Sequence, residues 1–253
     1  MIKKNLLKKN LKLKKTQIGT WSSIPVLNVI DVLAVTQLDY VIIDMEHGSV
    51  GFETLEGMIR AAYTKKITPI VRLSDSSENN ILRALETGVQ SLMIPHINNV
   101  DLAEKVSKYC KYKPLGTRGL SPYTFSHNYD YKNLATSLNK NNNENFLGIL
   151  VEGKKGLENL EDIAKVPNID VIYLGLFDIS QSLNLPPDLN NPLIKKELKR
   201  CAKIITKNKK IAGSMAQDIK YVKLLKNLGY KFIAYGNDTY AIKQFYDNLY
   251  KNI

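Results

Sequence analysis

The amino-acid sequence predicts a closed (β/α)8 TIM barrel, because eight short runs rich in apolar and β-branched residues alternate with longer helical patterns. Such alternation implies right-handed crossovers and a parallel sheet, and eight repeats favour a barrel over an open doubly wound sheet. No G-x-G-x-x-G follows the first strand, so a dinucleotide-binding fold loses its main support. We expect residues 1–253 to form one barrel domain, a common size for this fold.

Each element is defined by its own pattern of apolar residues and turn signals. The expected strands are Gln17–Trp21, Tyr40–Asp44, Thr68–Arg72, Ser91–Pro95, Phe146–Glu152, Val171–Gly175, Ile211–Met215 and Phe232–Tyr235. The expected helices are Pro25–Thr36, Gly51–Thr64, Glu78–Thr87, Val100–Tyr112, Gly156–Val166, Ile194–Asn208, Ile219–Leu228 and Thr239–Asn252. Residues 113–145 form a long loop, which we interpret as an active-site or subunit-interface loop, with a disordered surface insert as the alternative.

The net charge of +12 comes in large part from the basic N-terminal segment, residues 1–16, in which leucines and lysines are interleaved. This pattern fits a helix on an anionic membrane or, as we favour, a short helix that plugs the closed end of the barrel. Aromatic residues are not interleaved with arginines, which argues against a nucleic-acid partner. No apolar run is long enough to span a membrane, and a secretion signal is missing. Two distant cysteines fit a reducing cytosol, so we expect a cytoplasmic protein.

Charged residues stand at the carboxyl ends of several predicted strands, which is where (β/α) barrels carry out chemistry. Glu152 and Asp178 come from adjacent strands and suit a hard divalent cation such as Mg²⁺ or Mn²⁺. His96, after the fourth strand, is a further imidazole candidate at the same mouth, although we favour a rim histidine bonded to the backbone. The residues expected at this mouth are Trp21, Asp44, Glu46, His47, Arg72, Glu152 and Asp178. Among them, His47 can act as a general base, and Arg72 can bind a carboxylate or a developing enolate.

An ordered set of motifs carries a resemblance that extends from about Gln17 to the last helix. The motifs are Gly19-Thr20-Trp21, Asp44-x-Glu46-His47-Gly48, Pro69-Ile70-Val71-Arg72, Leu85-Glu86-x-Gly88, Pro114-x-Gly116-x-Arg118-Gly119, Val151-Glu152 and Gly175-x-x-Asp178-Ile179-Ser180. Together they resemble the HpcH/HpaI aldolase family. These are metal-dependent pyruvate aldolases, such as 4-hydroxy-2-oxoheptanedioate aldolase and 2-keto-3-deoxy sugar-acid aldolase.

The resemblance implies a class II aldolase that reversibly cleaves a 4-hydroxy-2-oxo acid to pyruvate and an aldehyde. It implies Glu152 and Asp178 as ligands of Mg²⁺, Mn²⁺ or Co²⁺, which would stabilise a pyruvate enolate together with Arg72. Trp21 is expected at the substrate mouth. The backbone N–H groups of the stretch Gly175, Leu176, Phe177 and Asp178 would face the pyruvate carboxylate. No predicted strand ends in a lysine at the mouth, which favours metal over Schiff-base chemistry.

The resemblance also assigns positioning roles and an assembly. His47 resembles the base that moves the proton of the aldol hydroxyl. Glu86 stands where the family has the aspartate that orients this base, and Asp44 is expected to accept a hydrogen bond from water or from the imidazole. The family further implies a homohexamer, a trimer of dimers whose subunits exchange the C-terminal helix.

Three departures from the family pattern leave alternatives open. Leu150 replaces a polar residue on the fifth strand, Phe177 replaces a small residue beside the metal, and Glu86 replaces the aspartate. One alternative is a carbon–carbon lyase acting on a CoA thioester, like the malyl-CoA and citrate lyase β relatives. The other is a barrel that has lost catalysis and serves as a binding protein, which Leu150 and Phe177 favour.

Overall fold

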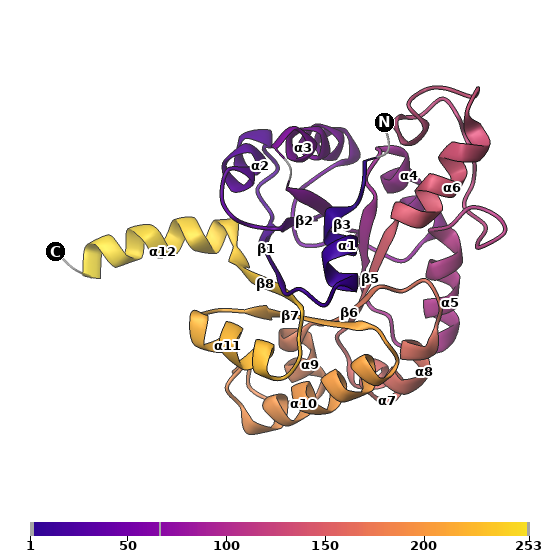
Figure 1. Ribbon diagram of the computed structural model, residues 1–253. Coiled ribbons are helices and arrows are strands. Elements are labelled where there is room, and N and C mark those ends of the chain that lie inside the picture. Colours follow the sequence, from indigo (N-terminus) through magenta and orange to yellow (C-terminus); the bar gives the residue numbers. More distant parts are fainter. Residues whose placement is uncertain (1–2, 66, 252–253) are drawn as a thin grey trace.

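Eight parallel strands close into a barrel in the computed structural model, which describes residues 3–65 and 67–251 (Figure 1). Each strand pairs with the next along the chain, and β8 pairs with β1. The strands are β1 (Gln17–Ser22), β2 (Tyr40–Asp44), β3 (Thr68–Arg72), β4 (Ser91–Ile94), β5 (Phe146–Val151), β6 (Val171–Leu174), β7 (Ile211–Ala216) and β8 (Phe232–Asn237). The predicted TIM barrel is confirmed, with strand ends that differ from the prediction by at most two residues.

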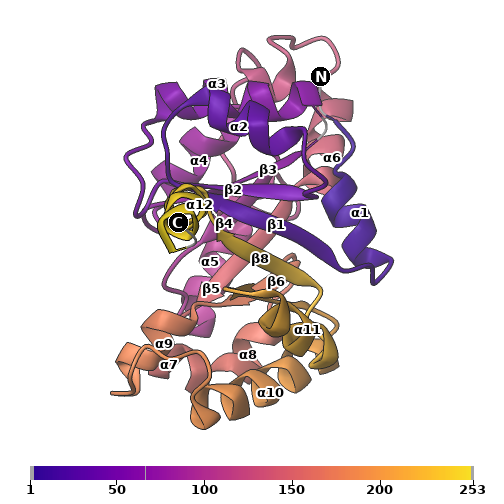
Figure 2. The same cartoon turned by 90° about the vertical axis from the view of Figure 1, so that its left-hand side faces the viewer.

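Helices surround the barrel on its outside (Figure 2). They are α1 (Leu6–Lys12), α2 (Leu27–Ala34), α3 (Phe52–Lys65), α4 (Glu78–Glu86), α5 (Val100–Tyr109), α6 (Leu134–Glu144), α7 (Lys154–Glu158), α8 (Leu160–Lys165), α9 (Leu176–Ser182), α10 (Pro192–Lys207), α11 (Ile219–Asn227) and α12 (Asp238–Lys251), with a 3₁₀ turn η1 (Phe125–His127). The predicted helix Gly156–Val166 is two helices, because the backbone leaves helical geometry at Asn159. The predicted end of the last helix, Asn252, lies outside the described residues, as do residues 1–2 of the basic segment.

The long connection after α5 contains structure that the sequence did not predict, namely η1 and α6. It leads from a helix to the amino end of β5, so it lies at the end of the barrel opposite the strand carboxyl termini. There the guanidinium carbon of Arg60 lies 4.8 Å from the centre of the Phe125 ring, and Glu144 accepts the backbone N–H of Asn5 at 2.7 Å. The prediction of an active-site loop is therefore wrong within one chain. A subunit-interface role stays a prediction.

The N-terminal helix α1 closes the amino end of the barrel, as predicted. Leu7 and Leu11 are buried and join the cluster of side chains inside the barrel. In that cluster, Tyr40 stacks on Phe232 with ring centres 4.2 Å apart. A side chain at Gly19 would place its Cβ 2.3 Å from the Tyr40 ring, so this close packing requires glycine. The interior is thus a packed core, which leaves the strand ends as the place for a site.

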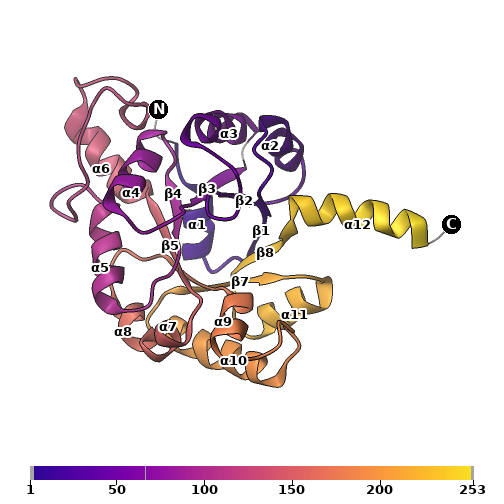
Figure 3. The ribbon, with the colours of Figure 1, turned by 180° about the vertical axis from the view of Figure 1, so that it is seen from behind.

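The C-terminal helix α12 projects away from the barrel (Figures 1 and 3). Its root is fixed by Asp238, whose carboxylate accepts hydrogen bonds from the Ser22 hydroxyl at 2.8 Å and from the backbone N–H groups of Ser23 and Ile24. Beyond this root, Phe245 and Tyr250 are each more than 70% exposed. None of the helices in residues 3–65 and 67–251 combines the length and apolarity that crossing a bilayer would need.

Candidate active site

Strand β2 ends in a turn that its own terminal carboxylate organises. Asp44 Oδ1 accepts the backbone N–H groups of Glu46 at 3.0 Å and His47 at 3.2 Å. The same oxygen accepts Nε–H of Arg72 at 2.8 Å, and Oδ2 accepts Nη2–H of the same guanidinium. Asp44 therefore holds Arg72 through a two-point contact from the neighbouring strand, which fixes the plane of the guanidinium. The acceptor role that we predicted for Asp44 is filled by Arg72 and the backbone, and the His47 ring is not its partner.

Arg72 is buried at the mouth and carries its charge between acidic neighbours. Its Nη1 lies 2.9 Å from Glu46 Oε2, and its guanidinium carbon lies 4.5 Å from the centre of the Trp21 ring. Burial by itself lowers the pKa of Arg72, but the hydrogen bonds and charges of Asp44, Glu46 and Glu152 outweigh burial, so the pKa is raised. Arg72 is therefore a permanent cation. Its guanidinium has little freedom to move, because one face lies against the Trp21 ring and its N–H groups pair with Asp44 and Glu46.

A histidine bridges two carboxylates beside Arg72. In His96, Nε2 lies 2.8 Å from Glu46 Oε1, and Nδ1 lies 2.9 Å from Glu152 Oε1. The backbone N–H of His96 donates to that same Glu152 oxygen at 2.7 Å. His96 has a φ of +57°, a left-handed backbone conformation that is uncommon for histidine. Strained backbone of this kind is concentrated at functional sites, so the bridge is part of the candidate site.

Glu152 follows β5 and is crowded by other acids. Its pKa is raised, first by burial and then by the negative charges of Glu46 and Asp178, while His96 acts in the opposite direction. Gly175 makes this position possible, because a Cβ there would lie 2.9 Å from Glu152 Oε2 and 2.7 Å from its Cβ. A glycine after β6 thus leaves room for the carboxylate of the neighbouring strand.

The start of α9 contributes residues of different exposure. Leu176 is buried between the barrel and its helices, whereas Asp178 and Phe177 are exposed. Asp178 is near enough for its charge to raise the Glu152 pKa. Phe177, which is 38% exposed, is available at the surface to contact a ligand, but Leu176 can contribute only its backbone.

Two predicted partners do not meet in this chain. His47 has an exposed ring, and within the described residues that ring has no hydrogen-bond partner. Glu86 ends α4 at the amino end of the barrel, where its Oε1 accepts a hydrogen bond from Arg118 at 2.9 Å. The predicted pairing of His47 with Glu86 is therefore wrong within one chain, because an α helix returns the chain to the far end of the barrel. Through the same contact, Arg118 anchors the long connection to α4 by an ion pair.

The donor atoms at the mouth fit a divalent cation. Ligand atoms of Glu46, His96 and Glu152 all lie within 4.8 Å of one another. Two carboxylates and an imidazole form a donor set that Mg²⁺, Mn²⁺ or Co²⁺ accepts. Of the predicted ligand pair, Glu152 belongs to this three-residue group and Asp178 does not.

Sequence reasoning missed the central place of Glu46 and His96. Glu46 was expected at the mouth without a role, and His96 was interpreted as bonded to the backbone. A signal was present, because His96 comes two residues after the end of β4, on the same edge as Arg72 and Glu152. The contact through both ring nitrogens depends on the left-handed backbone at His96, which no sequence pattern announces.

Comparisons with known proteins agree on one family. A sequence model described as HpcH/HpaI aldolase/citrate lyase matches residues 17–244. A 2-keto-3-deoxy-L-rhamnonate aldolase from Salmonella gallinarum is 29% identical over 235 residues, which cover 93% of this chain and 88% of that protein.

Solved structures have the same fold. The crystal structure of the citrate synthase SbnG superposes with a TM-score of 0.89 at 26% identity, over 97% of this chain and 96% of that one. An HpcH/HpaI aldolase/citrate lyase family protein from Burkholderia cenocepacia gives a TM-score of 0.91 at 23% identity, over 98% of both chains, a likeness that shows the fold.

Proposed function

The chain belongs to the HpcH/HpaI aldolase/citrate lyase family, and on this basis we propose that it reversibly cleaves a 4-hydroxy-2-oxo acid to pyruvate and an aldehyde with a divalent metal ion. The curated relatives are 2-keto-3-deoxy-L-rhamnonate aldolases, which supports an aldolase and points to sugar-derived oxo acids as the substrate class.

The observation that carries the proposal is the fixed cation Arg72 beside the buried carboxylate Glu152. Asp44 and Glu46 hold the guanidinium from two directions, and Trp21 covers one of its faces. A cation held in this way needs no rearrangement when negative charge develops on the keto oxygen of the substrate. Preorganised charge of this kind is among the largest contributions to catalysis.

Glu152 would hold the metal ion, together with Glu46 and His96 or with Asp178. When bound, the ion supplies positive charge to the carboxylate and keto oxygens of the oxo acid. The backbone N–H groups of residues 176–178, at the start of α9, would orient the carboxylate. Besides burial, the negative charges of Glu46 and Asp178 raise the Glu152 pKa. A bound cation would relieve this repulsion among the three carboxylates.

His47 is the proposed base for the aldol hydroxyl. In cleavage, the 4-hydroxyl gives its proton to His47, the C3–C4 bond breaks, and the aldehyde leaves. The electron pair of that bond passes to the pyruvate part as its enolate, on which Arg72 acts, and C3 then takes up a proton. The exposed ring of His47 fits this role because it must reach a substrate that enters from solvent.

Exchange of the pyruvate methyl protons in D₂O, followed by NMR, tests the proposal without knowledge of the aldehyde. We expect exchange with Mg²⁺, Mn²⁺ or Co²⁺, and its loss in EDTA and in Glu152→Ala. Glu158→Ala removes an exposed carboxylate from the next helix and should keep the wild-type rate. A folded protein that exchanges no protons with any of these ions would contradict a pyruvate aldolase.

A second candidate is a reaction that makes or breaks citrate or a related acid through a thioester. It is favoured by the likeness to the citrate synthase SbnG at 26% identity. Release of free thiol from acetyl-CoA in the presence of oxaloacetate would identify it. Thiol release without pyruvate exchange would replace the aldolase proposal by this one.

We also propose that the protein is a homo-oligomer in which a partner covers α12. This helix leaves the barrel and exposes Ile242, Phe245, Tyr246, Leu249 and Tyr250. A continuous apolar surface of this kind marks an interface. Light scattering after gel filtration should give a mass above one chain for the wild type and a smaller mass for Phe245→Glu. A monomeric wild type would contradict the proposal.

A further inference from the structure

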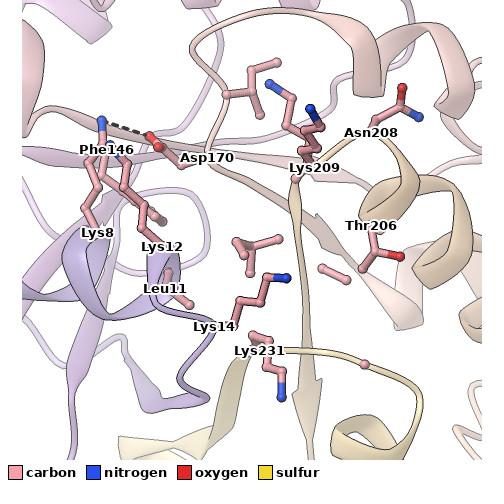
Figure 4. Close-up of a pocket in the computed structure, with 15 residues that line it drawn as sticks. Lys8, Leu11, Lys12, Lys14, Phe146, Asp170, Thr206, Asn208, Lys209 and Lys231 are labelled. Carbon is pink, nitrogen blue, oxygen red and sulfur yellow. Dashed lines mark ion pairs between the residues drawn. The ribbon is translucent and has the colours of Figure 1, made fainter.

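A cavity of about 560 Å³ lies at the amino end of the barrel, opposite the candidate active site (Figure 4). It is lined by α1, by the end of α10 and by the segments that lead into β5, β6, β7 and β8. A cavity of this size can hold a small organic molecule of ordinary size. It is independent of the mouth, because the packed interior of the barrel separates the two ends.

Lysines dominate the wall of this cavity. The basic residues are Lys8, Lys12, Lys14, Lys209, Lys210 and Lys231, and Asp170 is the single acid among the lining residues described. Lys8 Nζ lies 3.5 Å from Asp170 Oδ2, and Lys210 Nζ donates to the Val166 carbonyl at 2.7 Å. These two contacts account for two of the ammonium groups and for the one carboxylate.

The other four ammonium groups have no ion pair or hydrogen bond within the described part of the chain. They belong to Lys12, Lys14, Lys209 and Lys231. Lys12 and Lys14 come from the α1 side, and Lys209 comes from the end of α10, more than 190 residues later (Figure 4). Because separate segments deliver these charges to one cavity, their like charges repel until an anion neutralises them.

Two of these lysines occupy backbone positions that normally favour another residue. Lys14 has a φ of +58° and Lys209 a φ of +60°, and both follow a helix end. Glycine and asparagine are the usual residues in left-handed positions after helices, because other side chains are strained there. The turn therefore does not explain the lysines, and their ammonium groups must be explained by the cavity.

The floor of the cavity is apolar. Its members are Leu11, Phe146, Ile169, Ile211 and Ala212. Four of these five residues are at most 3% exposed, so a ligand in the cavity would meet mainly the lysine side chains. We propose that the amino end of the barrel binds a small molecule through a polyphosphate group.

Calorimetric titration of the full chain with ATP in EDTA tests this site directly. Each exposed charge contributes up to about 1 kcal/mol, so Lys12→Gln/Lys14→Gln/Lys209→Gln should weaken ATP binding by about tenfold or more. Higher salt should weaken wild-type binding as well. Adenosine should not bind, and inorganic tripolyphosphate should bind about as tightly as ATP, because the lysines contact only the phosphate groups.

A matched variant controls for overall charge. Lys105→Gln/Lys132→Gln/Lys220→Gln removes the same charge at exposed positions that do not line the cavity, and it should bind ATP as the wild type does. Thermal melting verifies that both triple variants are folded. Equal losses in the two triple variants, or no ATP binding by the wild type, would overturn the site. An affinity for tripolyphosphate far below that for ATP would overturn the assignment of the site to phosphate groups.

Discussion

The two ends of the barrel carry opposite charges that are organised in opposite ways. At the carboxyl end, Asp44, Glu46 and Glu152 are largely buried and are tied to Arg72 and His96 by contacts of 2.7 to 2.9 Å. At the amino end, lysines surround a cavity, and four of them have no partner within the described residues.

This difference indicates what each end can do. Groups that are fixed before a substrate arrives are suited to chemistry, because they do not have to reorganise as charge develops. Ammonium groups that are unpaired and flexible are suited to capturing an anion, because binding removes their mutual repulsion. The predictions below test this contrast in order of the effect expected.

Arg72→Lys should have the largest effect, because it keeps the charge but loses the two-point contact with Asp44. We expect the metal-dependent exchange of pyruvate methyl protons to fall by about 10²–10³-fold, the loss typical for removal of one preorganised donor. NMR in D₂O measures it. Arg200→Lys, in an ion pair on α10, is the control and should exchange at the wild-type rate. A rate within about threefold of wild type in Arg72→Lys would show that a fixed guanidinium is not required.

The buried ammonium group of Lys111 tests whether the amino end of the barrel also contains a charge that burial makes unfavourable. Burial lowers the pKa of Lys111 from 10.5 to about 8, and its Nζ donates to the Asn142 carbonyl at 2.6 Å. Between pH 8 and 10.5 the unfolded chain holds the proton that the folded chain has lost, so stability contributed by this group rises with pH.

The comparison with Lys111→Met isolates this effect. The free energy of unfolding of the wild type, relative to the variant, should increase by about 3 kcal/mol from pH 8 to pH 10.5. Denaturant unfolding at several pH values measures the change. A difference that stays constant over this range would mean that Lys111 titrates alike in the folded and unfolded chains.

Asn5→Ala should weaken the attachment of α1 to the amino end of the barrel and leave the candidate active site unchanged. The Asn5 side chain accepts the N–H of Lys8 at the start of α1 and donates to the Ser91 hydroxyl at 2.9 Å. Loss of such a cap costs about 1 kcal/mol. Denaturant unfolding should show this loss, while pyruvate exchange stays at the wild-type rate. Asn227→Ala, at an exposed position, should change neither quantity, and a fall in exchange for Asn5→Ala would indicate that the two ends are coupled.

Glu152→Gln should have a small effect on stability, and that effect should be favourable. Because the Glu152 pKa is raised, the folded chain holds its proton to a higher pH than the unfolded chain does. The charged carboxylate therefore costs stability at neutral pH, a cost that disappears as the pH falls below the usual value. In metal-free protein at pH 7, we expect the free energy of unfolding of the variant to be slightly higher than that of the wild type. Equal stability of the two proteins at pH 7 would contradict the crowding of acids at the mouth.

The strands and most helices were predictable from the sequence, because their periodicity records which face is buried. The same is true of Arg72 and Glu152, which stand directly at strand ends and so reach the mouth whatever the details of packing. The helix α6 was missed because its sequence, rich in Asn, lacks an apolar stripe. Its stability comes from contacts such as the bond between Asn5 and Glu144, which lie far apart in the chain.

By itself, the sequence determined the barrel, the end at which the charged residues gather and the plug formed by α1. All of these follow from local patterns of apolar and charged side chains. Only the tertiary structure decided which of those residues meet. It joined His96 to Glu46 and Glu152, separated Glu86 from His47 by the length of α4, and collected lysines of α1 and of the α10 end around one cavity. The physical reason is that such contacts depend on strand register and on single backbone angles, which barrel closure fixes and local sequence does not.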